Sequence, residues 1–421
     1  MKILFIVPYV PTPLRVRSYN FVRCLTQRGH SVVVLAPWSD NSDLAAGTAL
    51  RSSCDDVRLH RVSRVSSLMN CLGALPSKRP LQAVFSWSPE LADDVLESIT
   101  DVEGASAFDI IHVEHLRGAK YGLLVKDHQV NWRRPVPVVW DSVDCISHLF
   151  AQASERSASM TSRIWTNFEL PRTRRFEGNL LTRFDRVLFT SRNDLREMHK
   201  LLGNGQLPAP SDVVTNGVDL GEFKPPARAE SRDNHSLVVS GKMSYHANQT
   251  MVTHLVENIM PRIWSTRPDV NLWIVGADPT SALRQLGGNP RINVTGTVPH
   301  LPPYIQRATI ALAPLVYGTG VQNKVLEAMA CGTPVVASRA AIGNLAAIAG
   351  RDLLVAEDDE DFAAQVERLL DAPAHRREIG WAGRRYVESH HRWGDAAQKL
   401  EEAYLAALDT RNRANGSSNT H

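Results

Sequence analysis

Tyr317-Gly-Thr-Gly-Val-Gln-Asn-Lys-Val-Leu-Glu-Ala-Met-Ala-Cys-Gly-Thr-Pro-Val-Val-Ala-Ser338 is the segment from which the architecture of this chain can be read. An apolar run at 310–315 leads into it and predicts a buried strand. Gly318 and Gly320 predict a loop, a helix follows over about 322–330 until Gly332, and 334–338 predicts a second strand. A strand, a glycine loop and a helix N-terminus form an anion site, because unpaired backbone N–H groups and the positive helix end point to the same place.

Glu327 lies about one and a half turns inside this predicted helix. A carboxylate at that depth can accept hydrogen bonds from the vicinal hydroxyls of a ribose whose phosphates bind at the helix start. The segment therefore predicts a site for a nucleotide sugar.

The same segment resembles the family 4 glycosyltransferases, which have the GT-B fold: an α/β architecture of two Rossmann-like parallel-sheet domains facing a cleft. Their hallmark is a pair of glutamates separated by seven residues, the second inside a segment reading LEAMACGTPVVA. Residues 325–337 match that segment almost letter for letter, which implies that Glu327 binds the donor ribose. The first glutamate would fall at Thr319, so the contact with the donor sugar is altered here. The sequence of residues 320–327 is most similar to the corresponding segment of sugar transferases found beside bacterial exopolysaccharide and exosortase (PEP-CTERM) genes.

Length and composition fit a globular chain with two Rossmann-like domains. The 421 residues are 43% hydrophobic and 22% charged, and the net charge of +3 does not call for a nucleic acid partner. The apolar run of Met1–Val7 stops at Pro8 and predicts a first strand rather than a signal peptide. No run approaches the roughly 18 apolar residues of a membrane span. Five scattered cysteines predict free thiols in a reducing cytoplasm.

The predicted domain organisation has five parts. Residues 1–220 form an N-terminal acceptor domain, 221–235 a linker, 236–392 a nucleotide-sugar domain, 393–409 a C-terminal helix and 410–421 a disordered tail. The adjacent Pro225 and Pro226 place the linker, and the low apolar content places the tail. By resemblance, the C-terminal helix crosses back to the N-terminal domain.

The first loop of the N-terminal domain carries Arg15 and Arg17, where the resembled family has paired glycines. Arginine at a helix start can clamp a phosphate, and a solvated basic turn explains the pair equally well. A strand near 108–115 ends in polar residues, and the family's second histidine in this region approaches the donor sugar, which implies that role for His115. Asp141 and Asp144 follow another strand, where they could hold acceptor hydroxyls or cap the loop.

In the nucleotide-sugar domain, Gly241-Lys242 corresponds to the Gly-Arg with which the family neutralises the donor diphosphate, and Asn248 or its neighbour His246 occupies the family's second basic position. The loop after residue 295 corresponds to the region that holds the base. Lys324 is a further candidate cation. The resemblance and the anion-site pattern together assign to the donor Gly241, Asn248, Gly296, Thr297, Val298, Thr319, Gly320, Val321, Gln322, Asn323 and Glu327. The catalytic candidates are His115, Lys242 and Glu327.

A basic, amphipathic stretch lies within 51–80, which holds six Lys/Arg and two Asp/Glu. Its apolar residues recur at helical spacing at Val62, Val65, Leu68, Met69 and Leu72. The favoured interpretation is a helix whose apolar stripe packs on the sheet. The alternative is a helix that lies on an anionic membrane, where a lipid-linked acceptor would be found.

No D-x-D sequence stands at a strand end, and Asp358-Asp359 reads as a helix cap. The resemblance implies metal-independent, retaining transfer from a nucleotide-diphosphate sugar, by default a UDP-sugar, to a hydroxyl of a glycan, lipid-linked or small-molecule acceptor. The enzyme would need no cofactor and would be cytoplasmic, with peripheral contact with the inner membrane as an option. A nucleotide-sugar 2-epimerase and a non-catalytic nucleotide-sugar binding protein are the alternatives. A Rossmann dehydrogenase is disfavoured because no G-x-G-x-x-G follows the first strand.

Overall fold

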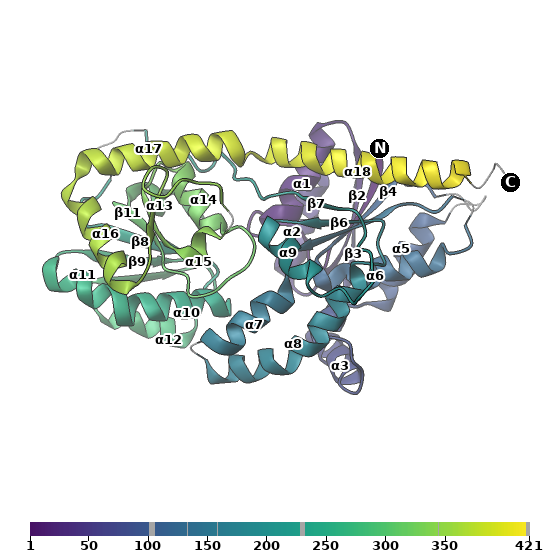
Figure 1. The fold of residues 1–421 in the computed structure, drawn as a ribbon, viewed down its shortest axis with the longest axis horizontal. Helices are drawn as coiled ribbons and strands as arrows, with labels where there is room; N and C mark the ends of the chain where they lie inside the picture. Colours follow the sequence, from purple (N-terminus) through teal and green to yellow (C-terminus); the bar gives the residue numbers. More distant parts are fainter. Residues whose placement is uncertain (101–105, 133, 158, 228–231, 344, 418–421) are drawn as a thin grey trace. The chain divides into compact units, whose positions relative to one another are not determined.

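The computed structural model describes residues 1–100, 106–132, 134–157, 159–227, 232–343 and 345–417. The chain divides into two compact units. The first comprises Met1–His148, Phe168–Thr215 and Trp393–His421, and the second comprises Leu149–Asn167 and Asn216–Arg392. Figure 1 shows a twisted sheet with helices on both faces in each unit.

The first unit contains a seven-stranded, all-parallel sheet in the order β3-β2-β1-β4-β5-β6-β7. Its strands are β1 (Lys2–Ile6), β2 (Ser31–Trp38), β3 (Asp56–Arg61), β4 (Ile110–Glu114), β5 (Val138–Val143), β6 (Arg186–Phe189) and β7 (Ser211–Val213). The central strands are continuous apolar runs because both faces of the sheet are covered by helices. The reversal of strand order between β1 and β4 creates a switch point, and ligands of such sheets bind beyond the carboxyl ends of the strands there.

The helices of the first unit are α1 (Val16–Gln27), α2 (Asn41–Leu50), α3 (Arg64–Ala74), α4 (Leu81–Phe85), α5 (Pro89–Ile99), α6 (His115–His128), α9 (Arg192–His199) and α18 (Trp393–Ser417). Two further helices, α7 (Ile146–Arg156) and α8 (Met160–Leu180), each have one end in this unit and the other in the second unit.

The second unit also contains an all-parallel sheet, with six strands in the order β10-β9-β8-β11-β12-β13. Its strands are β8 (Ser236–Ser240), β9 (Asn271–Val275), β10 (Ile292–Gly296), β11 (Ile310–Ala313), β12 (Val335–Ser338) and β13 (Leu354–Ala356). Its helices are α10 (His246–His254), α11 (Met260–Thr266), α12 (Ser281–Gln285), α13 (Pro302–Arg307), α14 (Asn323–Ala330), α15 (Arg339–Ile342), α16 (Asp359–Asp371) and α17 (Pro373–His390). The switch point lies between β8 and β11. The two parallel sheets confirm the predicted α/β fold class.

The last helix, α18, belongs to the first unit although it ends the chain. Its inward residues Ala397, Leu400 and Tyr404 are fully buried in the core of that unit, and Trp393 packs edge-on against Phe21 of α1 at 5.4 Å between ring centroids. The helix continues to Ser417, past residue 410, where the sequence predicts a disordered tail. Residues 418–421 of that tail, and 228–231 of the predicted linker, lie outside the described residues.

The favoured interpretation of residues 62–72 is wrong. Val62 is buried just before α3, but the other four apolar residues of the stripe face solvent, with exposed fractions from 48% for Leu72 to 70% for Val65. The sequence pattern identified the stripe correctly but did not reveal which side of the helix meets the protein. Among the described residues, none of the helices combines the length and the apolar character that crossing a bilayer requires.

Candidate functional site: an anion-binding helix at the switch point of the second unit

The N-terminus of α14 lies just beyond the carboxyl end of β11, beside the switch point. Its cap residue, Gln322, makes no side-chain cap hydrogen bond. Its amide group instead donates from Nε2 to the carbonyl of Thr319 at 2.9 Å. Gly320 has a φ of 67°, a left-handed conformation that suits glycine and turns the loop toward the helix. The first N–H groups of α14 therefore have no side-chain cap, as an anion site requires.

Two contacts hold the loop before α14 in place. The buried Tyr317 shares a 2.8 Å hydrogen bond between its hydroxyl and Nδ1 of His246 at the start of α10. Gln152 of α7 pairs with the backbone of Gly318 in both directions, accepting from its N–H and donating to its carbonyl, each at 3.3 Å. Nothing in the local sequence around Gln152 signals this contact, because the two residues are 166 positions apart. The loop therefore has hydrogen-bond partners from distant parts of the chain.

The C-terminal end of α14 is held by two arginines. Arg384 donates to the carbonyl of Ala330 at 2.6 Å, and Arg232 donates to the carbonyl of Cys331 at 2.8 Å. Cations at this end satisfy free carbonyls and complement the negative end of the helix dipole. The helix is thus fixed at its C-terminal end, while among the described residues its N-cap makes no side-chain cap hydrogen bond.

Lys324 points inward toward α10. Its ammonium donates to Oδ1 of Asn248 at 2.5 Å and lies 3.8 Å from the sulfur of Met251. Burial lowers its pKa to about 8, and the carboxylate of Glu327 acts in the opposite direction. In the described part of the chain Lys324 has no carboxylate within ion-pair distance. A largely desolvated cation whose main partner is a neutral amide is suited to receive an anionic ligand.

Glu327 lies one turn further along α14 and is partly exposed. Burial raises the pKa of its carboxyl to about 7, Lys324 lowers it, and Glu222 raises it further. The side chain accepts no hydrogen bond from any described residue, so its oxygens are available to a ligand. Lys324 and Glu327 together place one cation and one carboxylate along the same helix, beside its uncapped N-terminus.

The carboxyl end of β8 carries Gly241, Lys242 and, on α10, Asn248. Gly241 has a φ of 150°, and a Cβ there would lie 2.8 Å from Nδ2 of Asn248, so glycine permits this close approach. Asn248 is buried and donates to the carbonyl of Lys242 at 2.9 Å. Lys242 itself is exposed, with its ammonium 3.9 Å from Asp278. The structure therefore groups Asn248 with Lys324 and leaves the predicted catalytic Lys242 at the surface.

The predicted base-binding loop follows β10, two positions from β8 in the same sheet. Gly296 has a φ of 70°, which explains why glycine occupies the strand end. Thr297 is exposed and Val298 is partly buried. These residues lie at the same carboxyl edge of the sheet as the α14 loop.

In the first unit, the predicted phosphate ligand Arg17 is already engaged. It is 4% exposed and forms a two-pronged ion pair with Asp141, at 2.7 Å from Nε and 3.0 Å from Nη2. Its third nitrogen donates to the carbonyl of Val214 at 2.9 Å. This pair joins α1 to β5 and leaves neither residue directed to a ligand, which differs from the roles that the sequence suggested for both.

Arg15 also has internal partners. It donates from Nη1 to the carbonyl of Val10 at 2.9 Å and to Asp43 at 3.1 Å, and its guanidinium lies 4.8 Å from the centre of the Tyr9 ring. With its side chain 36% exposed, it stays accessible from one side. These contacts give Arg15 internal partners, which neither the phosphate clamp nor the solvated basic turn suggested from the sequence includes.

His115 adopts a φ of 65° at the junction of β4 and α6. A left-handed backbone is uncommon for a residue with a side chain, and such conformations concentrate at functional sites. Burial lowers the pKa of its imidazole to about 3, so the ring is neutral at pH 7. Its Nδ1 accepts from the N–H of Arg117 at 3.2 Å, which leaves Nε2 as the atom that can meet a ligand.

Glu114, next to His115, is a polar residue that the sequence noted but did not assign. It is 1% exposed, its Oε1 accepts from the hydroxyl of Tyr9 at 3.2 Å, and its Oε2 has no partner among the described residues. Burial, followed by the nearby Asp141, raises its pKa to about 8. In the sequence, a functional role for Glu114 was indicated only by its position at the end of a predicted strand.

Another residue of β4, His112, has a structural role. His112 is fully buried, stacks on Phe5 at 4.0 Å between ring centroids and shares a 2.8 Å hydrogen bond with the hydroxyl of Tyr404 of α18. Asp144 lies after β5 near Asp194 and Glu177, and burial followed by Asp194 raises its pKa to about 7. Asp358 caps α16 by accepting from the N–H of Asp361 at 2.9 Å, which confirms its prediction as a cap.

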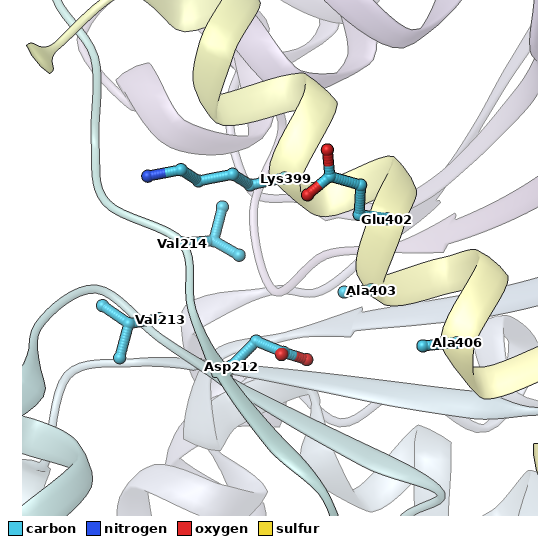
Figure 2. A pocket seen from close by; sticks show the side chains of 7 residues that line it. All are labelled: Asp212, Val213, Val214, Lys399, Glu402, Ala403 and Ala406. Carbon is cyan, nitrogen blue, oxygen red and sulfur yellow. The ribbon is translucent and has the colours of Figure 1, made fainter.

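A separate hollow of about 290 Å³ lies between β7 and α18 of the first unit (Figure 2). It is lined by Asp212, Val213, Val214, Lys399, Glu402, Ala403 and Ala406. None of the predicted site residues lines it, so we assign it no part in the site. Within the described ranges, no group of three or more His, Cys, Asp or Glu side chains is arranged to hold a metal ion.

Comparison with known protein families gives matches over most of the chain. Residues 15–222 match the model described as Glycosyltransferase Family 4, and residues 234–372 match the model described as Glycosyl transferases group 1. Among curated proteins, the chain is 28% identical over 249 residues to the D-inositol 3-phosphate glycosyltransferase of Segniliparus rotundus, covering 55% of this chain and 54% of that protein. The chain spans about half the length of the first curated relatives that it matches.

Solved structures share the fold over nearly the whole chain. Sucrose-phosphate synthase from Thermosynechococcus elongatus has a TM-score of 0.67 at 18% identity, covering 97% of this chain and 100% of that one. HepE from Anabaena, solved in complex with UDP and glucose, also has a TM-score of 0.67, at 16% identity, covering 96% and 100%. Two parallel sheets of this kind, with these neighbours, define the GT-B class. Together with the two family matches, they identify the chain as a glycosyltransferase of that class.

Proposed function

We propose that this protein transfers a sugar from a nucleotide-diphosphate sugar, with uridine as the base, to a hydroxyl of a glycan, lipid-linked or small-molecule acceptor. The observation that carries the proposal is the uncapped N-terminus of α14 with Lys324 and Glu327 on the same helix. The helix end and Lys324 would bind the diphosphate, and Glu327 would accept from the ribose hydroxyls. HepE, which shares the fold, has been solved with UDP and with UDP-glucose, which supports the choice of uridine.

We further propose that transfer is metal-independent and retains the anomeric configuration. Departure of the nucleotide leaves negative charge on the β-phosphate, and the amides of α14 with the ammonium of Lys324 would stabilise that charge in a preorganised way. The acceptor hydroxyl would attack on the face that the phosphate leaves, and a phosphate oxygen would take its proton. His115, whose Nε2 is available, would orient the donor sugar. These roles follow from the family resemblance, and Lys242 would add a second, exposed cation.

The compartment and pathway are also proposals. All five cysteines are free thiols, which fits the reducing cytoplasm. The resemblance of residues 320–327 to transferases encoded beside exopolysaccharide genes favours a role in the synthesis of a bacterial polysaccharide.

A nucleotide-sugar 2-epimerase of the same fold would use the same anion loop and ribose carboxylate. A non-catalytic binding protein would retain only the nucleotide site. Incubation with donor in the absence of acceptor separates the three: an epimer reveals the epimerase, slow hydrolysis fits the transferase, and unchanged donor with intact binding indicates the binding protein.

The nucleotide preference is tested by a thermal-shift screen with UDP, GDP, dTDP and ADP. We expect UDP to give the largest rise in melting temperature, because a ligand at a hundred times its Kd stabilises the folded state by about 2.7 kcal/mol. If no nucleotide shifts the transition, the α14 site is not a nucleotide site. If GDP or ADP gives the larger shift, the uridine assignment is wrong and the site assignment stands.

Thr319 is tested by the substitution Thr319→Glu, which restores the carboxylate that the resembled family carries there. A charged hydrogen bond to a sugar hydroxyl is worth about 1.5–3 kcal/mol, so we expect the ratio of kcat/KM between two UDP-hexoses to change by about tenfold or more. The neutral variant Thr319→Gln should change it much less. An unaltered ratio in Thr319→Glu would remove residue 319 from the sugar-binding part of the site.

A further inference from the structure

The helix α3 presents its large apolar side chains to solvent. Val65, Leu68, Met69 and Leu72 are 70%, 59%, 61% and 48% exposed, and Leu75, just after the helix, is 41% exposed. Their spacing of three and four residues places them along one face. In Figure 1, α3 lies on the periphery of the first unit.

The opposite face of α3, which meets the protein, carries small side chains, and Ala74 and Cys71 pack there against Leu81 and Val84 of α4. Ser67 and Ala74 are its buried residues. Asn70 donates from Nδ2 to the carbonyl of Trp87 at 2.9 Å, and the thiol of Cys71 lies 3.8 Å from the carbonyl of Leu81 in α4. A helix that only stabilises its own domain buries its apolar stripe. In α3 this arrangement is reversed, so the apolar face is left for a partner outside this unit.

The surroundings of this apolar face are basic. No Asp or Glu occurs between Val57 and Pro89, and this interval holds Arg58, Arg61, Arg64, Lys78 and Arg79. Arg58 is paired with Asp56 and Asp94. Arg64, at the start of α3, and Lys78 and Arg79, after its end, are exposed and make no ion pair with any described residue. Arg172 of α8 adds a further cation by donating to the carbonyl of Leu75 at 2.9 Å. Positive charge therefore lies at both ends of the apolar row.

We propose that α3 docks the first unit on the surface of an anionic lipid bilayer. Val65, Leu68, Met69 and Leu72 would enter the boundary between headgroups and acyl chains, while the cations at the two ends of the helix contact lipid phosphates. The 11 residues of α3 extend about 16 Å, which suits a helix lying in the interface and is too short to cross a hydrocarbon core of about 30 Å. This docking surface is additional to the proposed transfer reaction and does not depend on it.

Charge argues against a second copy of the chain as the occupant. A symmetric contact through α3 would bring the same basic flanks together without any carboxylate from this interval to compensate them. An anionic bilayer instead supplies both an apolar layer and the opposite charge.

The test is co-sedimentation of the full chain with vesicles, without donor or acceptor. One set of vesicles is phosphatidylcholine alone, and the other contains one quarter phosphatidylglycerol. We expect binding to the anionic vesicles, at least tenfold weaker binding to the neutral ones, and weakening by added salt. The variant Leu68→Asp/Met69→Asp should lose at least tenfold in vesicle affinity, and Lys78→Glu/Arg79→Glu should lose the preference for anionic vesicles.

The matched control is Leu207→Asp, which changes a leucine that is 86% exposed and lies outside α3, and which should bind as the unmodified chain does. Because all substituted side chains are exposed, melting temperatures should be unaffected, and any shift by UDP should persist. Equal vesicle binding by the α3 variant and the unmodified chain would overturn the proposal. So would a dimer that binds no vesicles and is dissociated by Leu68→Asp/Met69→Asp, because α3 would then be an interface between copies.

Discussion

Replacement of Glu327 by glutamine is expected to raise the KM for the nucleotide-sugar donor by about ten- to a hundredfold, because each charge-assisted hydrogen bond to a ribose hydroxyl is worth about 1.5–3 kcal/mol. The substitution keeps the shape of the side chain and removes the charge of the carboxylate. It also removes a group that is partly desolvated and accepts no hydrogen bond from the described residues, so the fold should lose little stability. The measurement is donor KM, together with the Kd for UDP by calorimetry.

The control for Glu327→Gln is Glu378→Gln, which removes an exposed carboxylate on α17 of the same unit. It should leave the KM and the Kd unchanged. If Glu327→Gln also binds UDP as the unmodified chain does, the ribose assignment is wrong, whatever the effect on kcat.

Replacement of Lys324 by methionine is expected to lower kcat by a factor on the order of 100 to 1000, as for the loss of one preorganised electrostatic contact to a developing charge. The methionine keeps the unbranched stem and removes the ammonium that lies 2.5 Å from Asn248. The effect should exceed that of Lys242→Met, because Lys242 is 66% exposed and its charge is screened by water. Steady-state kinetics at saturating donor measure both variants.

Lys224→Met, at an exposed position in the same unit, is the control for a general change of charge. If Lys242→Met lowers kcat more than Lys324→Met does, then the exposed lysine carries the phosphate contact. The arrangement of Lys324 and Asn248 would in that case be structural.

The same two residues predict a pH dependence. In the proposed roles, Glu327 binds the donor as a carboxylate and Lys324 as an ammonium, and their pKa values are about 7 and about 8. The kcat/KM for donor should therefore rise as the pH increases through 7 and fall as it increases through 8. The resulting pH profile is a narrow bell, and its two apparent pKa values belong to the interacting pair rather than to either residue alone. Glu327→Gln should remove the acid limb. Lys324→Met should remove the alkaline limb and move the acid limb upward, since Lys324 lowers the pKa of Glu327. A flat profile between pH 6 and 9 would contradict both assignments.

Much of the fold could be predicted from local sequence patterns. Continuous apolar runs at 2–7 and 310–315 predicted buried parallel strands, and β1 and β11 lie there. The glycines before residue 322 and the helical spacing after it predicted the loop and α14, including the place of Glu327 on that helix. These features depend on backbone geometry and on hydrophobic periodicity within a few residues, which a single sequence displays directly.

Side-chain partners were harder to predict because they come from distant segments. From the sequence, Arg17 is a candidate phosphate ligand. In the structure it forms an ion pair with Asp141, which is 124 positions away. The contact of Gln152 with Gly318 has no local signal, and Glu114 could be recognised only by its position at a strand end. The helix α18 extends to Ser417, although the composition of residues 410–421 suggested disorder, and its residues up to Leu408 pack on the core of the first unit.

By itself, the sequence determined that this chain has two parallel α/β units and a glycine loop followed by a helix with a carboxylate at 327, because periodicity and glycine placement are local. Only the tertiary structure decided that Lys324 faces Asn248 and that the apolar side of α3 faces solvent. The physical reason is the same in both cases. A helical pattern shows that a helix has two faces, but the element that packs against it determines which face is buried.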